Sequence, residues 1–342
     1  MSNARRSGQR LGLGRLAYKF YHEPIGKIRT SLREGGPIEQ HRTRSGHKAM
    51  RAAAAIMPAL REPAPGPLAQ IAFLSGARFW DQTLFCIVSL QQVCPFRVDP
   101  VVYDDGTLEV SIQAAMRRVV PWIRFVTSAE IGRQLDQRLP EHAFPALRAH
   151  RLVYPHLRKL TDIHIGSGSF TLVADSDMLF FHEPAEVITW FGQPQPLYMQ
   201  DVETAYGYPL DYLDALAGAK VPQSVNVGLY AIDSATIDWH QVEHWCESQL
   251  RDHGPHYLQE QALTAMLFAG LDAQVLPRER YIVMPGENEG LDPTAALHHY
   301  VSLSKKSYFR HGWRTVLANL TLTGTVNPTG HAPREMLLDR TE

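Results

Sequence analysis

Short apolar runs alternate with amphipathic stretches through the middle of the chain. Residues 70–75 form an apolar run that predicts a strand, and residues 81–92 follow with apolar side chains at helical spacing. The alternation continues with strands at 96–103 and 123–126 and with helices at 111–116, 128–139 and 150–160. Strands that alternate with helices in this way predict an α/β fold, with ligands bound at the carboxyl ends of the strands.

Residues 171–181 carry the strongest chemical signal. An apolar run that reads as a buried strand leads into Asp175 and Asp177, and a second apolar run follows them. A buried pair of carboxylates is costly unless a cation neutralises it, and this spacing suits Mg²⁺ or Mn²⁺ that also holds phosphate oxygens. Alone, the same two residues can equally cap a turn at the end of the strand.

Other charged residues stand where a phosphate or a sugar could meet them. Asp104 and Asp105 follow the second predicted strand and can contact a ribose or a base, or form the turn that Asp-Asp-Gly commonly makes. Arg158 and Lys159 lie on a predicted helix and suit a diphosphate, although a solvated helix face is the alternative. Asp201 ends a predicted edge strand and either points into a cleft or lies on the surface.

Amide and glycine residues follow in the second half of the chain. Asn226 enters an apolar strand, where its amide can bond sugar hydroxyls, and Gly228 permits a close backbone approach. A turn at the entry to the strand would use the same residues. Glu260 and Gln261 lie in the first turn of a predicted helix, where a Glu is also simply favourable with the helix dipole.

Two histidines precede two lysines near the end of the chain, at His298-His299 and Lys305-Lys306. One His can complete the ligand shell of a metal while a Lys neutralises phosphate. A pair of surface histidines is the alternative for this stretch in isolation.

Composition excludes several classes of protein. The 342 residues are 44% hydrophobic and 20% charged, which is typical of a globular protein. No run approaches the roughly 18 apolar residues of a membrane span. Cys86, Cys94 and Cys246 are odd in number and lack metal-type spacing, so reduced, buried thiols are expected. Together with the lack of an apolar segment after the basic residues 1–15, these features predict a cytoplasmic protein.

Charge is distributed unevenly along the chain. Residues 1–62 contain 13 Lys or Arg against 4 Asp or Glu, about +9, which leaves about −10 for the remainder. Amphipathic stretches within 11–32 suggest peripheral contact with an anionic membrane, or a solvated or packed extension. Because a Pro-rich linker follows at 62–67, we expect a basic extension and linker at 1–66, a compact catalytic domain at 67–312 and a tail at 313–342.

The motifs occur in a characteristic order over roughly residues 70–310. The series is Arg158, Asp175-Ser176-Asp177, Asn226-Val227-Gly228, Glu260-Gln261 and His299-x-x-Ser302-x-x-Lys305. It resembles the nucleotide-sugar glycosyltransferases of GT-A fold, and in particular the group of glycogenin and the bacterial lipopolysaccharide galactosyltransferases (family 8-like). Two departures stand out, because Ser302 replaces the Gly of that family, and Arg78 to Asp81 replace its usual Asp and Tyr.

The resemblance implies a GT-A fold, a single Rossmann-like unit with a mixed, mostly parallel sheet flanked by helices, here with a basic helical N-terminal extension. It implies a metal-dependent hexosyltransferase that uses a nucleoside-diphosphate sugar, a UDP-sugar, and retains anomeric configuration. The acceptor hydroxyl would belong to a carbohydrate, a lipid or a protein. No nucleic-acid partner is expected. The charge of the N-terminal arm adds the hypothesis of peripheral contact at the inner membrane surface.

The resemblance also implies roles for single residues. Asp175, Asp177 and His299 would ligate Mn²⁺ or Mg²⁺, with Asp175 also orienting the ribose. The catalytic candidates are Asp201, Asn226 and Glu260, and in an inverting enzyme Asp201 or Glu260 would act as the base. The candidates for binding the nucleotide sugar are Asp104, Asp105, Arg158, Lys159, Asp175, Ser176, Gly228, Gln261 and Lys305.

Three other functions fit parts of the pattern. A catalytically silent protein that binds sugar nucleotides would keep the same residues. A nucleotidyltransferase uses a similar metal arrangement. A phosphatase of the haloacid dehalogenase type also places an Asp-x-Asp after a buried strand, but it requires Thr two residues after the second Asp, where Leu179 stands.

Overall fold

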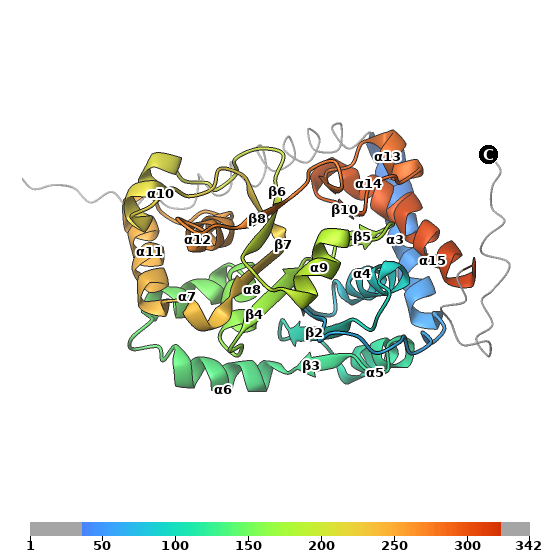
Figure 1. Ribbon diagram of the computed structural model, residues 1–342, viewed down its shortest axis with the longest axis horizontal. Helices are drawn as coiled ribbons and strands as arrows, with labels where there is room; N and C mark the ends of the chain where they lie inside the picture. The colour runs from blue at the N-terminus through green and yellow to red at the C-terminus, as the bar shows by residue number, and fades with distance from the viewer. Residues whose placement is uncertain (1–35, 323–342) are drawn as a thin grey trace, which may run out of the picture.

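The computed structural model describes residues 36–322 and has a central sheet covered by helices on both faces (Figure 1). The sheet has seven strands in the order β3-β2-β1-β4-β7-β6-β8. Only β7 runs antiparallel to its neighbours β4 and β6, while the other pairs are parallel. The strands in this order are β3 (Arg124–Val126), β2 (Asp99–Asp104), β1 (Gln70–Ser75), β4 (Phe170–Ala174), β7 (Val225–Asp233), β6 (Leu197–Gln200) and β8 (Gln274–Leu276).

A second, three-stranded sheet lies beside the first. Its order is β5 (Met178–Phe180), β10 (Leu297–His299) and β9 (Tyr281–Val283), with β10 antiparallel to β5 and parallel to β9. Because β5 follows β4 after three residues, the chain passes directly from the large sheet into the small one.

Two hydrophobic clusters fill the two faces of the large sheet, because successive side chains of a strand point to opposite faces. In β1, Ile71 and Phe73 belong to one cluster and Ala72 to the other. The first cluster takes its helical residues from α3 (Gly36–Ile56), α4 (Trp80–Val93), α5 (Val110–Val119), α9 (Ala185–Gly192) and α15 (Trp313–Leu322). The second takes them from α6 (Ser128–Arg138), α7 (Pro145–Val153), α8 (Leu157–His164), α10 (Leu210–Ala217), α11 (Trp239–Asp252) and α12 (Gln259–Leu267).

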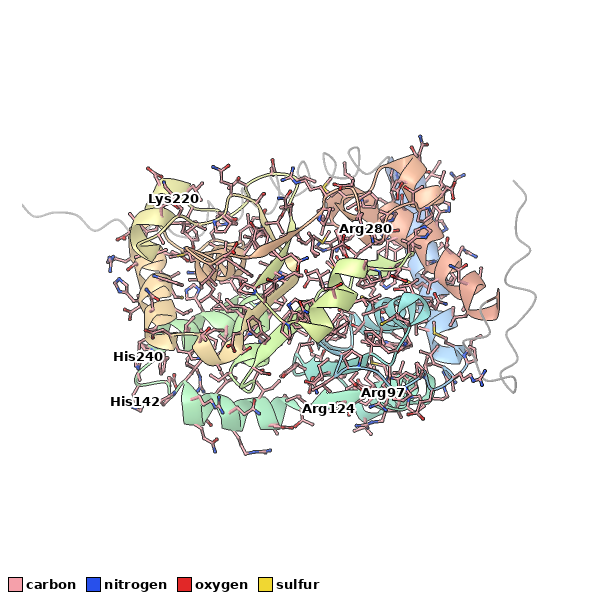
Figure 2. All side chains as sticks on the ribbon, viewed as in Figure 1. Arg97, Arg124, His142, Lys220, His240 and Arg280 are labelled. Atoms are coloured by element: carbon pink, nitrogen blue, oxygen red, sulfur yellow. The ribbon has the colours of Figure 1, made fainter. Side chains whose placement is uncertain are left out.

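The remaining elements are short. They are the helices α13 (Glu287–Leu291) and α14 (Lys305–Ser307), the 3₁₀ turns η2 (Ser234–Thr236) and η3 (Ser302–Ser304), and the π-helical turn η4 (Tyr308–Gly312). Figure 2 shows the labelled His142, Lys220 and Arg124 near the periphery of the molecule.

The predicted α/β fold, with a mostly parallel sheet flanked by helices, is confirmed. Two local predictions are wrong. The helix predicted over 150–160 is interrupted, because Pro155 disfavours a helical conformation at the residue before it and ends α7. The strand predicted at an edge, β6, is interior, because β8 pairs along its outer side.

Parts of both terminal segments pack with the central domain. Met50 and Ala54 of α3, and Trp313 and Leu320 of α15, are buried in the first hydrophobic cluster. The boundaries predicted at 67 and 312 therefore fall between elements that share one core. The amphipathic stretches expected within 11–32 lie outside the described residues. Within residues 36–322, no helix is both long and apolar enough to cross a membrane.

Candidate functional site

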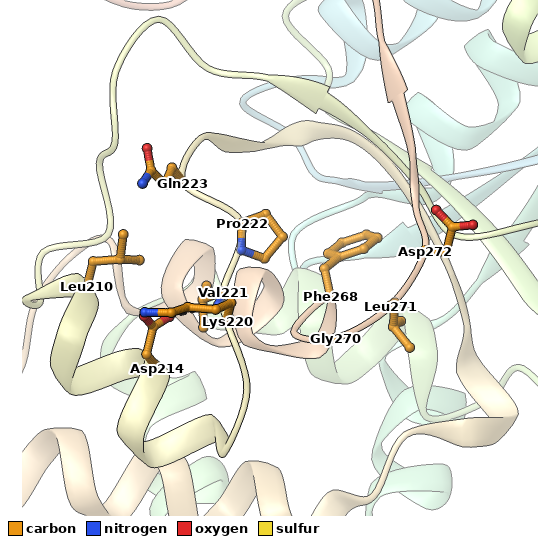
Figure 3. A pocket seen from close by; sticks show the side chains of 10 residues that line it. All are labelled: Leu210, Asp214, Lys220, Val221, Pro222, Gln223, Phe268, Gly270, Leu271 and Asp272. Carbon is orange, nitrogen blue, oxygen red and sulfur yellow. Dashed lines mark hydrogen bonds and ion pairs between the residues drawn. The ribbon is translucent and has the colours of Figure 1, made fainter.

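A pocket of about 670 Å³ lies beside the C-terminal end of α12 (Figure 3). Its lining includes the pair Asp214 and Lys220, together with Phe268, which follows the last residue of the helix. None of the candidate residues from the sequence lines this pocket. Glu260 and Gln261 belong to the opposite end of α12, and the candidate site is built there.

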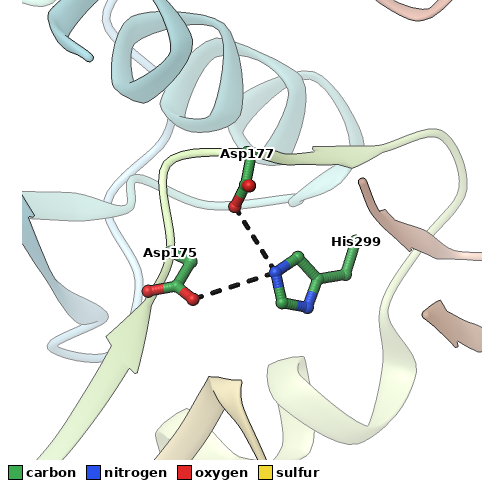
Figure 4. A group of neighbouring side chains, drawn as sticks. All are labelled: Asp175, Asp177 and His299. Atoms are coloured by element: carbon green, nitrogen blue, oxygen red, sulfur yellow. Dashed lines mark ion pairs between the residues drawn. The ribbon is translucent and has the colours of Figure 1, made fainter. Parts of the chain in front are cut away.

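The two aspartates lie where the chain crosses from the large sheet to the small one. Asp175 follows the last residue of β4, and Asp177 precedes the first residue of β5. His299 ends β10 and is paired with Met178 of β5, so the strand register brings it beside the aspartates. Its Nε2 is 3.4 Å from Asp177 Oδ1 and 3.8 Å from Asp175 Oδ2 (Figure 4). One ligand atom from each of the three side chains lies within 4.8 Å of the others.

The imidazole of His299 is oriented by β7. Its Nδ1 is 2.9 Å from Asn226 Oδ1, which also accepts the backbone N–H of Gly228 at 2.9 Å. Because the amide oxygen can only accept, Nδ1 carries the proton in this contact. The buried Nε2 then faces the two carboxylates, and it has no aligned hydrogen bond within the described part of the chain. A buried, unpartnered imidazole nitrogen beside two carboxylates is a donor set that fits a divalent cation.

Gly228 makes this approach possible. A Cβ atom at this position would lie 2.3 Å from His299 Cε1 and 2.5 Å from Met178 Cε. Its backbone oxygen accepts the N–H of Asp175 at 2.7 Å, so β7 supports both sides of the cluster.

Each of the two aspartates is paired with a lysine. Lys159 is buried, with its Nζ 2.9 Å from Asp175 Oδ1 and 3.7 Å from Glu260 Oε1. Lys305 is 43% exposed, and its Nζ is 3.2 Å from Asp177 Oδ2. Burial opposes ionisation of Asp177, but contact with His299 and the charge of Lys305 outweigh it and hold the pKa of that carboxyl below its ordinary value.

Burial has the opposite result at Glu260. It raises the pKa of that carboxyl to about 7, although the nearby ammonium of Lys159 acts against the shift. Burial lowers the pKa of Lys159, but the charges of Asp175 and Glu260 more than compensate and the net shift is upward. The buried Lys159 and Glu260 therefore form a charge cluster with the half-buried Asp175, which links them to the candidate cation site.

Three of the candidate residues share one hydrogen-bond network. Asp201 Oδ2 accepts the side-chain amide of Asn226 at 3.1 Å and that of Gln261 at 3.1 Å. Arg278 donates to the backbone oxygen of Asp201 at 2.7 Å and to Ser224 Oγ at 3.2 Å. Arg278 was not singled out from the sequence, where it is one basic residue in an exposed turn after β8.

Asp104 and Asp105 are engaged in the turn after β2. Asp104 Oδ1 accepts the N–H groups of Gly106 and Leu108, at 2.8 and 2.9 Å, and Asp105 Oδ1 accepts the N–H of Thr107 at 3.0 Å. Their carboxylates therefore make the contacts that the turn interpretation predicts. Contacts with a nucleotide stay a prediction.

Arg158 differs from its neighbour Lys159. Its guanidinium donates to the backbone oxygens of Asp105 and Arg151. It therefore lies at the turn after β2, whereas Lys159 reaches Asp175. Ser176 contacts α4, since its Oγ is 2.8 Å from the hydroxyl of Thr83, a residue that the sequence analysis did not identify.

Strand alternation separates the two histidines. His298 points away from the cluster, where it contacts Tyr300 Oη at 3.0 Å and Glu289 Oε1 at 2.8 Å. Ser302, which stands where the resembling family has Gly, has a left-handed backbone with φ of 51°. A left-handed backbone is most easily adopted by Gly, so Ser302 is a strained residue at this turn.

No model of a protein family and no curated protein matches the sequence. Among solved structures, the galactosyltransferase LgtC in complex with donor and acceptor sugar analogs is similar, at 16% identity over 78% of this chain and 99% of that chain, with a TM-score of 0.49. Mouse xyloside xylosyltransferase 1 is 9% identical over 68% of this chain and 97% of that chain, with a TM-score of 0.47. The glycosyltransferase GlyE of Streptococcus pneumoniae is 12% identical over 77% of this chain and 66% of that chain, with a TM-score of 0.44. These are likenesses of fold.

Proposed function

We propose that this protein is a glycosyltransferase that moves a hexose from a nucleoside-diphosphate sugar, a UDP-sugar, to an acceptor hydroxyl in a metal-dependent reaction. One observation carries the proposal. His299 comes from a distant part of the chain to meet Asp175 and Asp177, and its buried Nε2 faces the carboxylates without an aligned hydrogen bond to any residue between 36 and 322. Oxygen and imidazole ligands together suit Mn²⁺, and the carboxylates suit Mg²⁺.

When bound, the cation would supply positive charge that stabilises the diphosphate as it leaves. Asp175, Asp177 and His299 would hold it, and Asn226 would keep the imidazole in the tautomer that presents Nε2. Lys305 is the half-exposed cation of the site, and it would turn from Asp177 to the phosphate oxygens when the donor binds. Lys159 is buried and would balance the charge of Asp175 and Glu260.

The network of Asp201, Asn226 and Gln261 supplies polar atoms that would bind the hydroxyl groups of the sugar. A carboxylate and two amides provide both acceptors and donors for hydroxyl groups. Retention of configuration, which the resemblance implies, needs no strong enzymic base. If the enzyme inverts instead, Asp201 is better placed to act as the base, because Asp201 is half-buried and Glu260 is buried against Lys159.

The proposal is tested by incubating the protein with a panel of UDP-sugars and simple acceptors, with and without Mn²⁺. We expect cation-dependent release of UDP, and its loss in Asp177→Asn. Asp136→Asn, a change of the same kind at an exposed residue of α6, is the matched control. Full activity in Asp177→Asn would refute the assignment. Tight UDP-sugar binding without release of UDP would identify a silent binding protein instead.

The basic charge of residues 1–62 supports a second proposal, peripheral contact with an anionic membrane. Because α3 packs into the core, the chain should be shortened only by residues 1–35. We expect the intact chain to sediment with vesicles that contain anionic lipid, and the shortened chain to remain in the supernatant. Equal sedimentation of the two chains would contradict the proposal.

A further inference from the structure

Helix α3 precedes the central sheet in the chain, yet it contacts two segments that lead to the proposed cation site, one toward Thr83, which contacts Ser176, and one that begins at Lys305, which contacts Asp177. One segment, residues 77–81, follows β1, and the other, residues 305–312, follows His299. In Figure 1, α3 lies at the same side of the molecule as α14 and α15, and it packs against η4 and α4.

The contact with the second segment is made backbone to backbone. A Cβ atom at Gly46 would lie 2.2 Å from the backbone oxygen of Phe309, so only glycine allows this approach. The ring of His47 lies 4.3 Å from the ring of Phe309, centre to centre. Arg310 donates to the backbone oxygen of Glu39 at 2.6 Å and to Thr43 Oγ1 at 2.8 Å, and it forms an ion pair with the Glu39 carboxylate.

The contact with the first segment is polar. Arg51 donates to the backbone oxygen of Ala77 and lies over the ring of Trp80 at 5.7 Å. His47 Nε2 is 3.1 Å from Asp81 Oδ2, and the side chain of Asp81 is fully buried. Since His47 touches both Phe309 and Asp81, the helix ties the two segments to each other.

The geometry points to a specific role for this helix. Residues 305 to 322 are helical without interruption, through α14, η4 and α15. Lys305 and Phe309 are therefore about one turn apart, and a contact that fixes Phe309 also fixes Lys305 along the helix axis. We propose that α3 positions Lys305 for the diphosphate of the donor, with Gly46 and Arg310 as positioning residues. This inference rests on the proposed function.

The test combines Gly46→Ala with Lys305→Ala in a double-mutant cycle. The quantity measured is the affinity for UDP in the presence of Mn²⁺. Ala favours a helix over Gly, so any loss in Gly46→Ala comes from the clash with Phe309. Gly132→Ala in α6 is the matched control, because a Cβ atom there would meet nothing within 4 Å. Hydrogen exchange of residues 302–312 provides a readout that does not depend on any ligand.

We expect Gly46→Ala and Lys305→Ala each to lower the affinity for UDP by roughly tenfold or more, which is the effect of losing one charge-assisted hydrogen bond. We expect the double variant to be no weaker than Lys305→Ala alone, and Gly46→Ala to speed exchange in 302–312. Additive losses, or unchanged affinity in Gly46→Ala, would overturn the role of α3. If Gly46→Ala does not fold, Glu39→Gln replaces it in the cycle, with the same criteria.

The outcomes separate this inference from the function beneath it. If the wild-type protein fails to bind UDP with Mn²⁺, the proposed function is overturned, and the role of α3 with it. If wild-type binding is normal and the losses are additive, only the role of α3 is overturned.

Discussion

Replacing Gly228 by Ala should disturb the candidate site with the smallest possible change. The added Cβ atom would lie 2.3 Å from Cε1 and 2.5 Å from Nδ1 of His299, and 2.5 Å from Cε of Met178. The backbone of Gly228 is not left-handed, so Ala is compatible with the local conformation. The effect must therefore come from the crowding of His299, which has to move away from β7.

The cost has two parts. Overpacking a filled site costs about 1–3 kcal/mol, and loss of the hydrogen bond between His299 and Asn226 adds about 0.5–1.5 kcal/mol. We expect the free energy of unfolding to fall by about 1.5–4.5 kcal/mol in total. Because His299 would leave its place beside the aspartates, we also expect Mn²⁺ affinity to fall by roughly 10- to 100-fold.

Urea denaturation and a Mn²⁺ titration measure the two effects. Gly192→Ala is a suitable control, because the space around its Cβ is open. A double variant with His299→Ala should recover part of the lost stability, since the crowded ring is then absent. Wild-type stability together with wild-type Mn²⁺ affinity in Gly228→Ala would refute the reasoning.

Three further predictions concern stability. Burial lowers the pKa of His164 to about 3, so the folded state resists a proton that the unfolded chain accepts near pH 6.5. The contribution of His164 to the free energy of unfolding is complete above pH 6.5 and should fall by about 2 kcal/mol by pH 5. This loss should be absent in His164→Gln when urea midpoints are compared at pH 7 and 5. Glu243 accepts the first N–H groups of α7, from Ala146 and Leu147, so Glu243→Gln should cost about 1–2 kcal/mol in urea denaturation. Lys159→Met leaves the buried Glu260 and the half-buried Asp175 without their cation and should cost about 3–5 kcal/mol. The loss should be smaller at pH 5 than at pH 8 in thermal unfolding, because burial raises the pKa of Glu260 to about 7 and this carboxyl is neutral at pH 5. The first prediction is contradicted if the urea midpoint changes between pH 7 and pH 5 by the same amount in wild-type protein and in His164→Gln. An unchanged midpoint in Glu243→Gln contradicts the second. A loss of stability in Lys159→Met that does not depend on pH contradicts the third.

Local patterns were enough to predict much of the sheet. The apolar runs at 70–75 and 171–174 are strands, because a strand buried on both faces must be apolar at successive positions. The run after Asp177 also forms a strand, but in a different sheet, and nothing local predicts that its partner is β10. The position of His299 beside the aspartates follows from that long-range pairing, so the residues alone could suggest the cluster but not its geometry.

Other features depended on contacts that a local pattern does not contain. The basic residues of α3 indicate its exposed face. Its packing, however, depends on the close approach of Gly46 to the backbone oxygen of Phe309, which is far away in the sequence. Arg158 and Lys159 are adjacent and equally basic, and only the direction of each side chain sends one to the turn after β2 and the other to Asp175.

The crossing between the two sheets has a mechanical consequence. Asp175 is attached to the large sheet and His299 to the small one, whose strands are only three residues long. A cation bound by both residues would link the two sheets to each other. Removing it with a chelator should loosen the small sheet first, while the seven-stranded sheet keeps its own pairing.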